Sequence, residues 1–366
     1  MGFNCGIIGL PNVGKSTLFN ALTRTMSAQA ANYPFCTIEP NVGRVAVPDE
    51  RIDRLAILAN SVKTVPTQLE FVDIAGLVRG ASKGEGLGNQ FLGHIRQVDA
   101  LVHVLRCFEG EVTHVEGSVD PLRDAATVET ELMLADLDSL ERRTDATVKK
   151  ARAGDMESKA IAPVMEQALA LLREGKPVRR LRTELSHEDA ARLQTLQLLT
   201  AKPVLYACNV GESEAATGNA LAAKVAAMAK SEGGAAVIIS AAIESEIAQL
   251  APEEQKDFLD TLSLDEPGLN RVIRAGYTLL DLITFFTVGP KETRAWTIPH
   301  GAKAPQAAGA IHTDFERGFI RAETIAYDDY VRLGGESACR EAGKVRQEGK
   351  EYLVVDGDIM HFKFNV

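Results

Sequence analysis

Two glycines, a lysine and a serine near the N-terminus have the spacing of a phosphate-binding loop. Residues 9–17 read G-L-P-N-V-G-K-S-T. Gly9 and Gly14 tolerate backbone conformations that a Cβ would hinder, so successive N–H groups can turn toward a phosphate. Lys15 would bring a positive charge to the outer phosphates, and Ser16 a hydroxyl ligand for Mg²⁺. The expected nucleotide contacts are Asn12, Val13, Gly14, Lys15, Ser16 and Thr17.

A second group of residues would complete a magnesium site beside that loop. Asp73 ends an apolar stretch and begins D-I-A-G, which places a carboxylate near Mg²⁺ and the N–H of Gly76 near the γ-phosphate. Thr37 lies between the first helix and the second strand, where it can reach the ion when triphosphate is bound. The expected metal ligands are therefore Ser16, Thr37 and Asp73. The glycine-rich residues 80–90 are either a nucleotide-dependent switch or an ordinary flexible loop.

Hydrolysis needs a group that orients water, and the usual glutamine is missing. In Ras-like enzymes a Gln follows D-x-x-G, whereas this chain has Leu77, which cannot form a hydrogen bond with water. His114, in a segment flanked by glycines, is our candidate for a catalytic residue, together with Lys15. His103 is the rival, but it lies within an apolar strand, so we expect it to be a structural core residue.

The segment that would recognise the base begins at Asn209. A guanine-specific site reads N-K-x-D, in which the Asp accepts two guanine hydrogen bonds and the Lys stem covers the ring. This chain has Val210 in place of the Lys and Glu212 in place of the Asp. Guanine preference should weaken, and adenine becomes an alternative. The expected base contacts are Asn209, Val210, Glu212, Ser240, Ala241 and Ala242.

The elements that position these residues are short strands rich in Val, Ile and Leu. We expect strands at residues 4–10, 42–47, 68–73, 100–107, 203–209 and 235–240. Alternation with helices predicts an α/β fold, a P-loop NTPase with a mostly parallel sheet and helices on both faces. Residues 1–125 and 200–280 would form this nucleotide-binding (G) domain.

Residues 126–199 have a helical period instead and predict an inserted helical domain. Two long antiparallel helices would pack as a coiled-coil hairpin, and a third helix would begin near Ser186. Basic residues crowd what we expect to be the distal half of the hairpin, which is either a docking surface for RNA or the ribosome or an ordinary solvated face. They are Arg142, Arg143, Lys149, Lys150, Arg152, Lys159, Arg173, Lys176, Arg179, Arg180 and Arg182.

The last part of the chain, residues 281–366, predicts a small α+β module. Short strands are expected at residues 285–288, 292–298, 324–326 and 352–355, and short helices at 304–311 and 327–333.

Composition limits the class of protein. The chain has 366 residues and a net charge of −10, which argues against a generally basic nucleic-acid coat but permits a local basic patch. Its five cysteines are scattered, so we expect free thiols in a reducing cytosol, with a redox role considered only for Cys36. No apolar run approaches the roughly 20 residues that span a bilayer, so we expect no membrane association.

Taken together, these motifs resemble the YchF, or Obg-like ATPase, family in the Obg branch of the translation-factor-related P-loop NTPases. The resemblance rests on residues 9–17, 32–41, 73–91 and 209–212, and on residues 294–298, 312–321 and 357–359, which look like the family's TGS domain. It covers essentially the whole chain and implies a G domain interrupted by a coiled coil, then a β-grasp TGS domain.

The resemblance also implies a function. It implies Mg²⁺-dependent hydrolysis of ATP with GTP as a lesser substrate, a cytoplasmic location, ribosome binding (the large subunit above all), and a role in translation or stress regulation. Leu77 fits the family's lack of a catalytic Gln, and the family's catalytic His would be His114. Asn12 lies where related enzymes place a potassium-coordinating Asn, so K⁺ is a further candidate.

Two other functions remain open at this point. The chain could be a GTP-specific translation-associated GTPase, or a binding protein whose nucleotide gates partner docking while hydrolysis is incidental. Leu77 favours the second of these, because it leaves unaided hydrolysis without a group that orients water.

Overall fold

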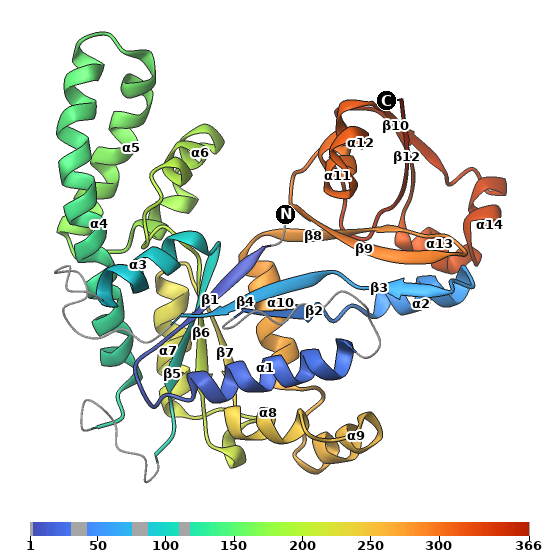
Figure 1. Cartoon of the computed structure of the whole chain (residues 1–366), viewed down its shortest axis with the longest axis horizontal. Helices are drawn as coiled ribbons and strands as arrows, with labels where there is room; N and C mark the ends of the chain where they lie inside the picture. Colours follow the sequence, from blue (N-terminus) through green and yellow to red (C-terminus); the bar gives the residue numbers. More distant parts are fainter. Residues whose placement is uncertain (1–2, 31–41, 75–86, 110–117, 366) are drawn as a thin grey trace.

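The computed structural model describes residues 3–30, 42–74, 87–109 and 118–365, which form two six-stranded sheets and a projecting helical hairpin (Figure 1). The first sheet has the order β2-β4-β1-β5-β6-β7 and is parallel except for β2, which is antiparallel to β4. Its strands are β1 (Asn4–Ile8), β2 (Val42–Ala46), β4 (Gln68–Asp73), β5 (Ala100–Arg106), β6 (Val204–Asn209) and β7 (Ala235–Ile239).

Burial on both faces explains why the central segments are strands. Every residue of β5 and β6 is buried, and their near-continuous apolar sequences are typical of parallel strands covered by helices. The predicted α/β fold with a mostly parallel sheet is confirmed. The helices around this sheet are α1 (Lys15–Ala30), α3 (Leu87–Gln97), α7 (Ala220–Ser231), α8 (Ala241–Ile247), α9 (Pro252–Thr261) and α10 (Gly268–Leu279).

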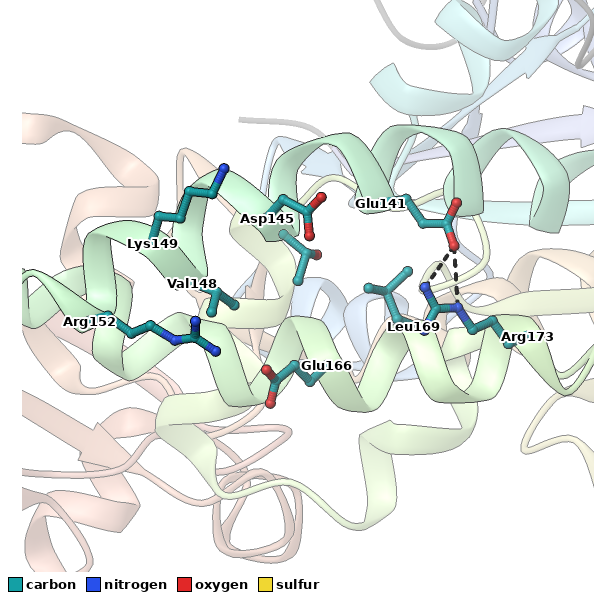
Figure 2. Close-up of a pocket in the computed structure, with 9 residues that line it drawn as sticks. Glu141, Asp145, Val148, Lys149, Arg152, Glu166, Leu169 and Arg173 are labelled. Carbon is teal, nitrogen blue, oxygen red and sulfur yellow. Dashed lines mark hydrogen bonds and ion pairs between the residues drawn. The ribbon is translucent and has the colours of Figure 1, made fainter.

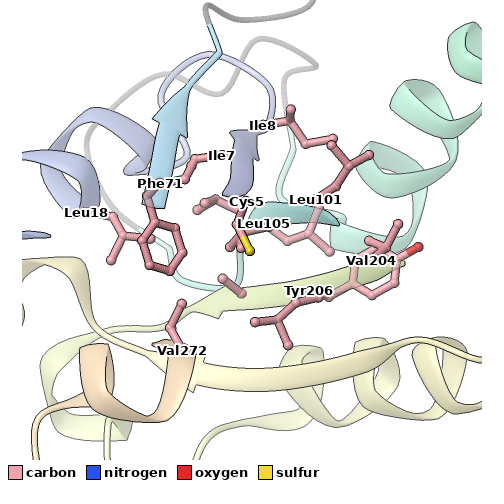
Figure 3. Close-up of a cluster of buried hydrophobic side chains, with 14 of the residues drawn as sticks. Cys5, Ile7, Ile8, Leu18, Phe71, Leu101, Leu105, Val204, Tyr206 and Val272 are labelled. Atoms are coloured by element: carbon pink, nitrogen blue, oxygen red, sulfur yellow. The ribbon is translucent and has the colours of Figure 1, made fainter. Parts of the chain in front are cut away.

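The main hydrophobic core joins this sheet to its helices (Figure 3). Ile7 of β1 and Phe71 of β4 are fully buried, and so are Leu18 of α1 and Val272 of α10. Close packing makes such a core rigid. It therefore holds the carboxyl ends of β1 and β4, where the phosphate loop and Asp73 lie, in a fixed relation.

The helical hairpin consists of α4 (Pro121–Arg152) and α5 (Met156–Arg173), which pack along their length. Asp120 caps α4 by accepting hydrogen bonds from the N–H groups of Leu122 and Arg123, and the turn between the helices uses Gly154 at φ +103°. The 3-10 helix η2 (Val178–Thr183) and α6 (His187–Thr195) follow. Ser186 caps α6, as predicted.

The proposed basic surface of the hairpin needs correction. Only Lys149, Lys150, Arg152 and Lys159 lie near the Gly154 turn, whereas Arg173 ends α5 and residues 176–182 follow it, at the other end of the hairpin. Arg179 is 4% exposed and forms ion pairs with Glu129 and Glu232. Its charge therefore neutralises carboxylates inside the protein and is not available to a docking surface. The prediction was wrong here because sequence periodicity does not reveal which cations have buried partners. Other members of the run pair at the surface: Arg142 with Asp138, Arg173 with Glu141, and Lys176 with Glu174.

The second sheet forms the C-terminal module and has the order β11-β10-β12-β8-β9-β3. Its strands are β8 (Leu282–Thr287), β9 (Glu292–Pro299), β10 (Phe319–Ile325), β11 (Arg346–Glu348), β12 (Ile359–Phe364) and, from the N-terminal part of the chain, β3 (Lys63–Val65). Its helices are α11 (Ala304–Ile311), α12 (Thr313–Arg317), α13 (Tyr327–Leu333) and α14 (Glu336–Glu341).

Two features of this module differ from the prediction. Residues 352–355 are not a strand, because Leu353 makes only an isolated bridge to Lys303, and the chain enters the sheet later, as β12. In addition, α2 (Glu50–Leu58) and β3 were not predicted; Ile52 and Leu55 pack against Phe286 of β8. Residues 50–65, which form α2 and β3, thus pack with the C-terminal sheet and not with the first one.

Candidate functional site

The predicted phosphate loop lies between β1 and α1, as the motif requires. Gly9 has φ +154°, Asn12 φ +62° and Gly14 φ +93°, so the chain turns sharply at three of six positions. Helix α1 begins at Lys15, and the N–H of Leu18 donates to the Gly14 carbonyl at 3.0 Å. The first N–H groups of the helix therefore face the loop, which makes an anion site.

Close approach of the backbone explains both glycines of the motif. A Cβ on Gly9 would lie 2.6 Å from the carbonyl oxygen of Val104, and a Cβ on Gly14 would lie 2.2 Å from Nδ2 of Asn209. Neither distance is possible for a real side chain, so the loop can take this path only with glycine at both positions.

Asp73 and Lys15 meet at the carboxyl ends of β1 and β4. Ile7 pairs with Asp73 across the two strands, and Lys15 Nζ donates to the carbonyl of Ile74 at 3.3 Å. Burial lowers the pKa of the Lys15 ammonium while the charge of Asp73 opposes this change. Burial raises the pKa of the Asp73 carboxyl, and Lys15 opposes that change. Burial thus disfavours the charged forms of both Lys15 and Asp73. An anion near Lys15 and a cation near Asp73 would offset this cost.

A magnesium ion fits the donor atoms present here. Oδ1 of Asp73 is buried and has no hydrogen-bond partner among the described residues, and Ser16 is exposed at the start of α1. A carboxylate and a hydroxyl with room for phosphate oxygens and water are what Mg²⁺ prefers. The third expected ligand, Thr37, lies outside the described residues.

Asn209 joins the phosphate loop to the loop that follows β7. Its Nδ2 donates to the carbonyl of Val13 at 2.9 Å, and its Oδ1 accepts from the N–H of Ala241 at 2.9 Å. The side chain is 4% exposed. One amide therefore fixes the relative position of two segments expected to hold opposite ends of the nucleotide.

The other expected base contacts lie around this amide. Val210 is buried, and its N–H donates to the carbonyl of Ile239 at 2.9 Å. Glu212 is exposed at the start of the 3-10 helix η3 (Glu212–Glu214), and Ala242 is exposed on α8. Ser240 is 2% exposed, and its hydroxyl has no partner within the part of the chain described. Their contacts with a base stay predictions.

His103 is a core residue, as predicted. It is 2% exposed within β5, its ring centroid lies 5.7 Å from that of Tyr206, and burial lowers its pKa to about 3. The rival candidate, His114, lies outside the described residues, as do Thr37, Gly76, Leu77, Cys36 and residues 80–86. Their predicted roles stay predictions.

Sequence reasoning missed the polar contacts that connect the site domain to the hairpin. Asp136 of α4, Thr200 and Lys202 form hydrogen bonds between segments far apart in sequence. No motif marks these residues, because each is an ordinary polar residue whose partners become neighbours only in the fold.

A separate groove of about 610 Å³ runs between α4 and α5 (Figure 2). Charged side chains of both signs line it, and Arg173 is bonded to Glu141 at 2.8 Å across it. It contains none of the motif residues, so it is not the nucleotide site. None of the described helices has the length and apolar character needed to cross a bilayer.

Comparison with known proteins covers the whole chain. Residues 4–209 match the family described as 50S ribosome-binding GTPase, and residues 282–365 match the YchF-GTPase_C family, described as a protein of unknown function. The chain is 55% identical over 367 residues to the Haemophilus influenzae protein named ribosome-binding ATPase YchF, and 52% identical over 369 residues to the Bacillus subtilis protein of that name. Both alignments span 100% of each chain.

Solved structures agree with this result. The Schizosaccharomyces pombe YchF GTPase is 40% identical with a TM-score of 0.88, covering 99% of this chain and 98% of that one. A GTP binding protein from Pyrococcus horikoshii OT3 is 19% identical with a TM-score of 0.61 over 99% of this chain and 100% of its own, and shares the fold.

Proposed function

The chain belongs to the YchF family of P-loop ATPases and GTPases, and from that premise we propose that it is a magnesium-dependent ATPase that acts as a nucleotide-controlled switch on the ribosome. GTP is the lesser substrate. The observation that carries this proposal is the juxtaposition of the phosphate loop, Lys15 and the buried, partly unpartnered carboxylate of Asp73. That combination binds a nucleoside triphosphate together with its metal.

The residues of the chain have separate tasks in hydrolysis. The N–H groups of the loop and of the start of α1 bind phosphate oxygens, and Lys15 neutralises charge that develops on the outer phosphates. Ser16 and Asp73, with Thr37, would hold Mg²⁺, which would supply further charge stabilisation when bound. Because Leu77 cannot orient water, we assign that task to His114.

The proposed preference for ATP rests on residues 209–212. The amide of Asn209 is held in place by Val13 and Ala241, and we assign base selection mainly to neighbouring groups. Glu212 is exposed and one methylene longer than the Asp of a guanine site, and Val210 is buried without a stem to cover the ring. The carboxylate of an Asp, which accepts from guanine N1–H and N2–H₂, is therefore missing at its usual reach, so the site loses its selectivity for guanine over adenine.

Ribosome binding is proposed from the names of the relatives, which are called ribosome-binding ATPases. We propose the large subunit as partner and assign the contact to RNA, through the turn of the hairpin and the C-terminal module. Lys149, Lys150, Arg152 and Lys159 are exposed around the Gly154 turn, where cations can meet RNA phosphates. Regulation of translation or stress response in the cytoplasm, and K⁺ binding at Asn12, belong to the same proposal.

Substitution Lys15→Ala tests the proposal. ATP turnover should fall to background while the unfolding transition stays cooperative, because the residue is the first of α1 and does not belong to the core. Lys150→Ala, an exposed lysine on α4, is the matched control and should keep full turnover without ribosomes. Unchanged turnover in Lys15→Ala would sink the proposal.

Leu77 supports the alternative of a nucleotide-gated binding protein. The variant His114→Ala distinguishes this alternative from the ATPase switch. If that variant binds ATP, has no turnover and still supports growth in cells that need the protein, hydrolysis is incidental. Loss of function together with turnover supports the ATPase switch. A large preference for GTP over ATP in competition would instead favour a GTP-specific enzyme.

A further inference from the structure

One short segment contacts both the site domain and the helical hairpin. Residues 199–202, here called the 199–202 linker, connect the helical insertion to β6, whose last residue is Asn209. Thr200, in its middle, is fully buried. The neighbours of the 199–202 linker come from α3, α4 and η2, which are distant from one another in sequence.

Toward the hairpin, the linker is bound through Asp136 of α4. The N–H groups of Leu199 and Thr200 each donate to this carboxylate at 2.8 Å, and the Thr200 hydroxyl donates to it at 2.7 Å. Asp136 is 2% exposed. Three donors on one buried carboxylate leave it little freedom, so α4 and the linker must move together.

The linker is also bound to the segment after α5. The Thr200 carbonyl accepts from the N–H of Arg179 at 2.8 Å, and the Thr200 hydroxyl accepts from the N–H of Val178 at 3.3 Å. The guanidinium of Arg179 then reaches Glu129 of α4 at 2.8 and 3.0 Å, and Glu232 at the end of α7 at 2.9 Å. Both helices of the hairpin are therefore anchored at the linker.

On the side of the site domain, the linker is bound through Lys202. Its Nζ donates to the carbonyls of Arg96 and Val98, at the carboxyl end of α3. A cation at this end of a helix satisfies carbonyls that have no partner within it. Burial lowers the pKa of Lys202, because the ammonium loses part of its hydration at this position. The hydrogen bonds to the two carbonyls replace that hydration. The contact joins α3 to the linker.

Helix α3 is the first described element after residues 75–86, which carry the predicted nucleotide-sensing motifs. We propose that the 199–202 linker couples the position of α3 to that of the hairpin, with Lys202 as the positioning residue, so that the bound nucleotide sets the orientation of the hairpin toward its partner. This inference rests on the proposed function, because it describes how the nucleotide state reaches the partner.

Nucleotide-dependent ribosome affinity tests the proposal. For the wild type we expect the affinity with a non-hydrolysable ATP analogue to differ from that with ADP by a factor of about 5 to 150, the usual range for coupled sites. In Lys202→Met, which keeps the stem and removes the ammonium, the factor should fall below about 2. Lys202→Arg should restore it, and Lys224→Met, on an exposed lysine of α7, should leave it unchanged.

A distance between two spin labels, measured by double electron–electron resonance, makes the test independent of the ribosome. Nitroxide labels at Arg152→Cys and Lys230→Cys, both exposed sites, report hairpin orientation in a Cys36→Ser background. The distance should change with nucleotide in the wild type and stay fixed in Lys202→Met. Asp136→Asn weakens the hydrogen bonds between the linker and α4. Its distance should also stay fixed, so this variant replaces Lys202→Met if the latter does not fold.

Each outcome decides one of the two proposals. A nucleotide-dependent distance that persists in both linker variants, or that is absent in the wild type, overturns the linker proposal. A wild-type distance that changes while ribosome affinity stays constant supports the linker and contradicts the proposed ribosome switch instead.

Discussion

Replacing Asn209 by alanine should weaken nucleotide binding by breaking the connection between two loops. The substitution removes the hydrogen bonds to the Val13 carbonyl and from the Ala241 N–H, both at 2.9 Å. The site is buried, so both backbone groups would lose their partners without gaining full access to water. Each such group costs about 1–3 kcal/mol.

The two losses together cost at least about 2 kcal/mol if the loops keep their bound geometry. The free protein can escape this cost by letting the phosphate loop relax, whereas the bound protein cannot. We therefore expect the Kd for ATP to rise by roughly 30-fold or more, since about 1.4 kcal/mol corresponds to tenfold. Isothermal titration calorimetry measures this change directly.

Inorganic tripolyphosphate separates loop geometry from base recognition, because it has no base. Its affinity should fall by a similar factor in Asn209→Ala. Asn219→Ala is the matched control: it removes an asparagine that accepts from the N–H groups of Leu221 and Ala222 at the start of α7, so it should lower stability and leave tripolyphosphate binding unchanged. A tripolyphosphate affinity within about threefold of wild type in Asn209→Ala would show that this amide does not hold the phosphate loop in its binding geometry.

Three further predictions concern the loop and the hairpin junction. Gly14→Ala should abolish measurable ATP binding in calorimetry, because its Cβ would lie 2.2 Å from Nδ2 of Asn209 at φ +93°. Arg179→Met should lower the free energy of unfolding in urea by about 3–5 kcal/mol, because it leaves the buried carboxylate of Glu129 and the partly buried one of Glu232 without their cation. Burial raises the pKa of Asp136 to about 6, so the folded state holds this proton more tightly than the unfolded chain, and stability should fall by roughly 3 kcal/mol as pH rises from about 4 to about 6.

Each of these has a control. Gly154→Ala also forces alanine to a positive φ, but in open space on the hairpin, so it should keep ATP binding. Arg142→Met removes an exposed ion pair and should change stability by less than about 1 kcal/mol. Asp136→Asn should lose the pH dependence assigned to this carboxyl. Equal effects in variant and control, or an unchanged pH profile in Asp136→Asn, would contradict the corresponding prediction.

The first sheet was predictable because its central strands are buried on both faces. Continuous apolar runs such as β5 and β6 mark themselves in the sequence, and the predicted ends agree with the structure to within two residues at each strand. The phosphate loop was equally clear, because glycine spacing and the flanking elements are local properties. Asp73 followed from its motif, and the pairing of β1 with β4 then placed it beside Lys15.

The parts that could not be predicted depend on contacts between distant segments. Strand β3 has three residues and no pattern of its own; it exists because β9 offers a free edge. Arg179 looked like a docking charge, because its partner Glu129 lies fifty residues away. The roles of Asn209 and Lys202 as connectors are likewise properties of the fold, since each joins backbone groups of segments that no sequence period relates.

Turnover of ATP and of GTP, measured in parallel with and without ribosomes, tests the central claim most directly. We expect that ATP is hydrolysed in preference to GTP, that ribosomes change the rate, and that Lys15→Ala removes turnover under every condition. Turnover of GTP at least tenfold more efficient than that of ATP, with no effect of ribosomes on either, would contradict it.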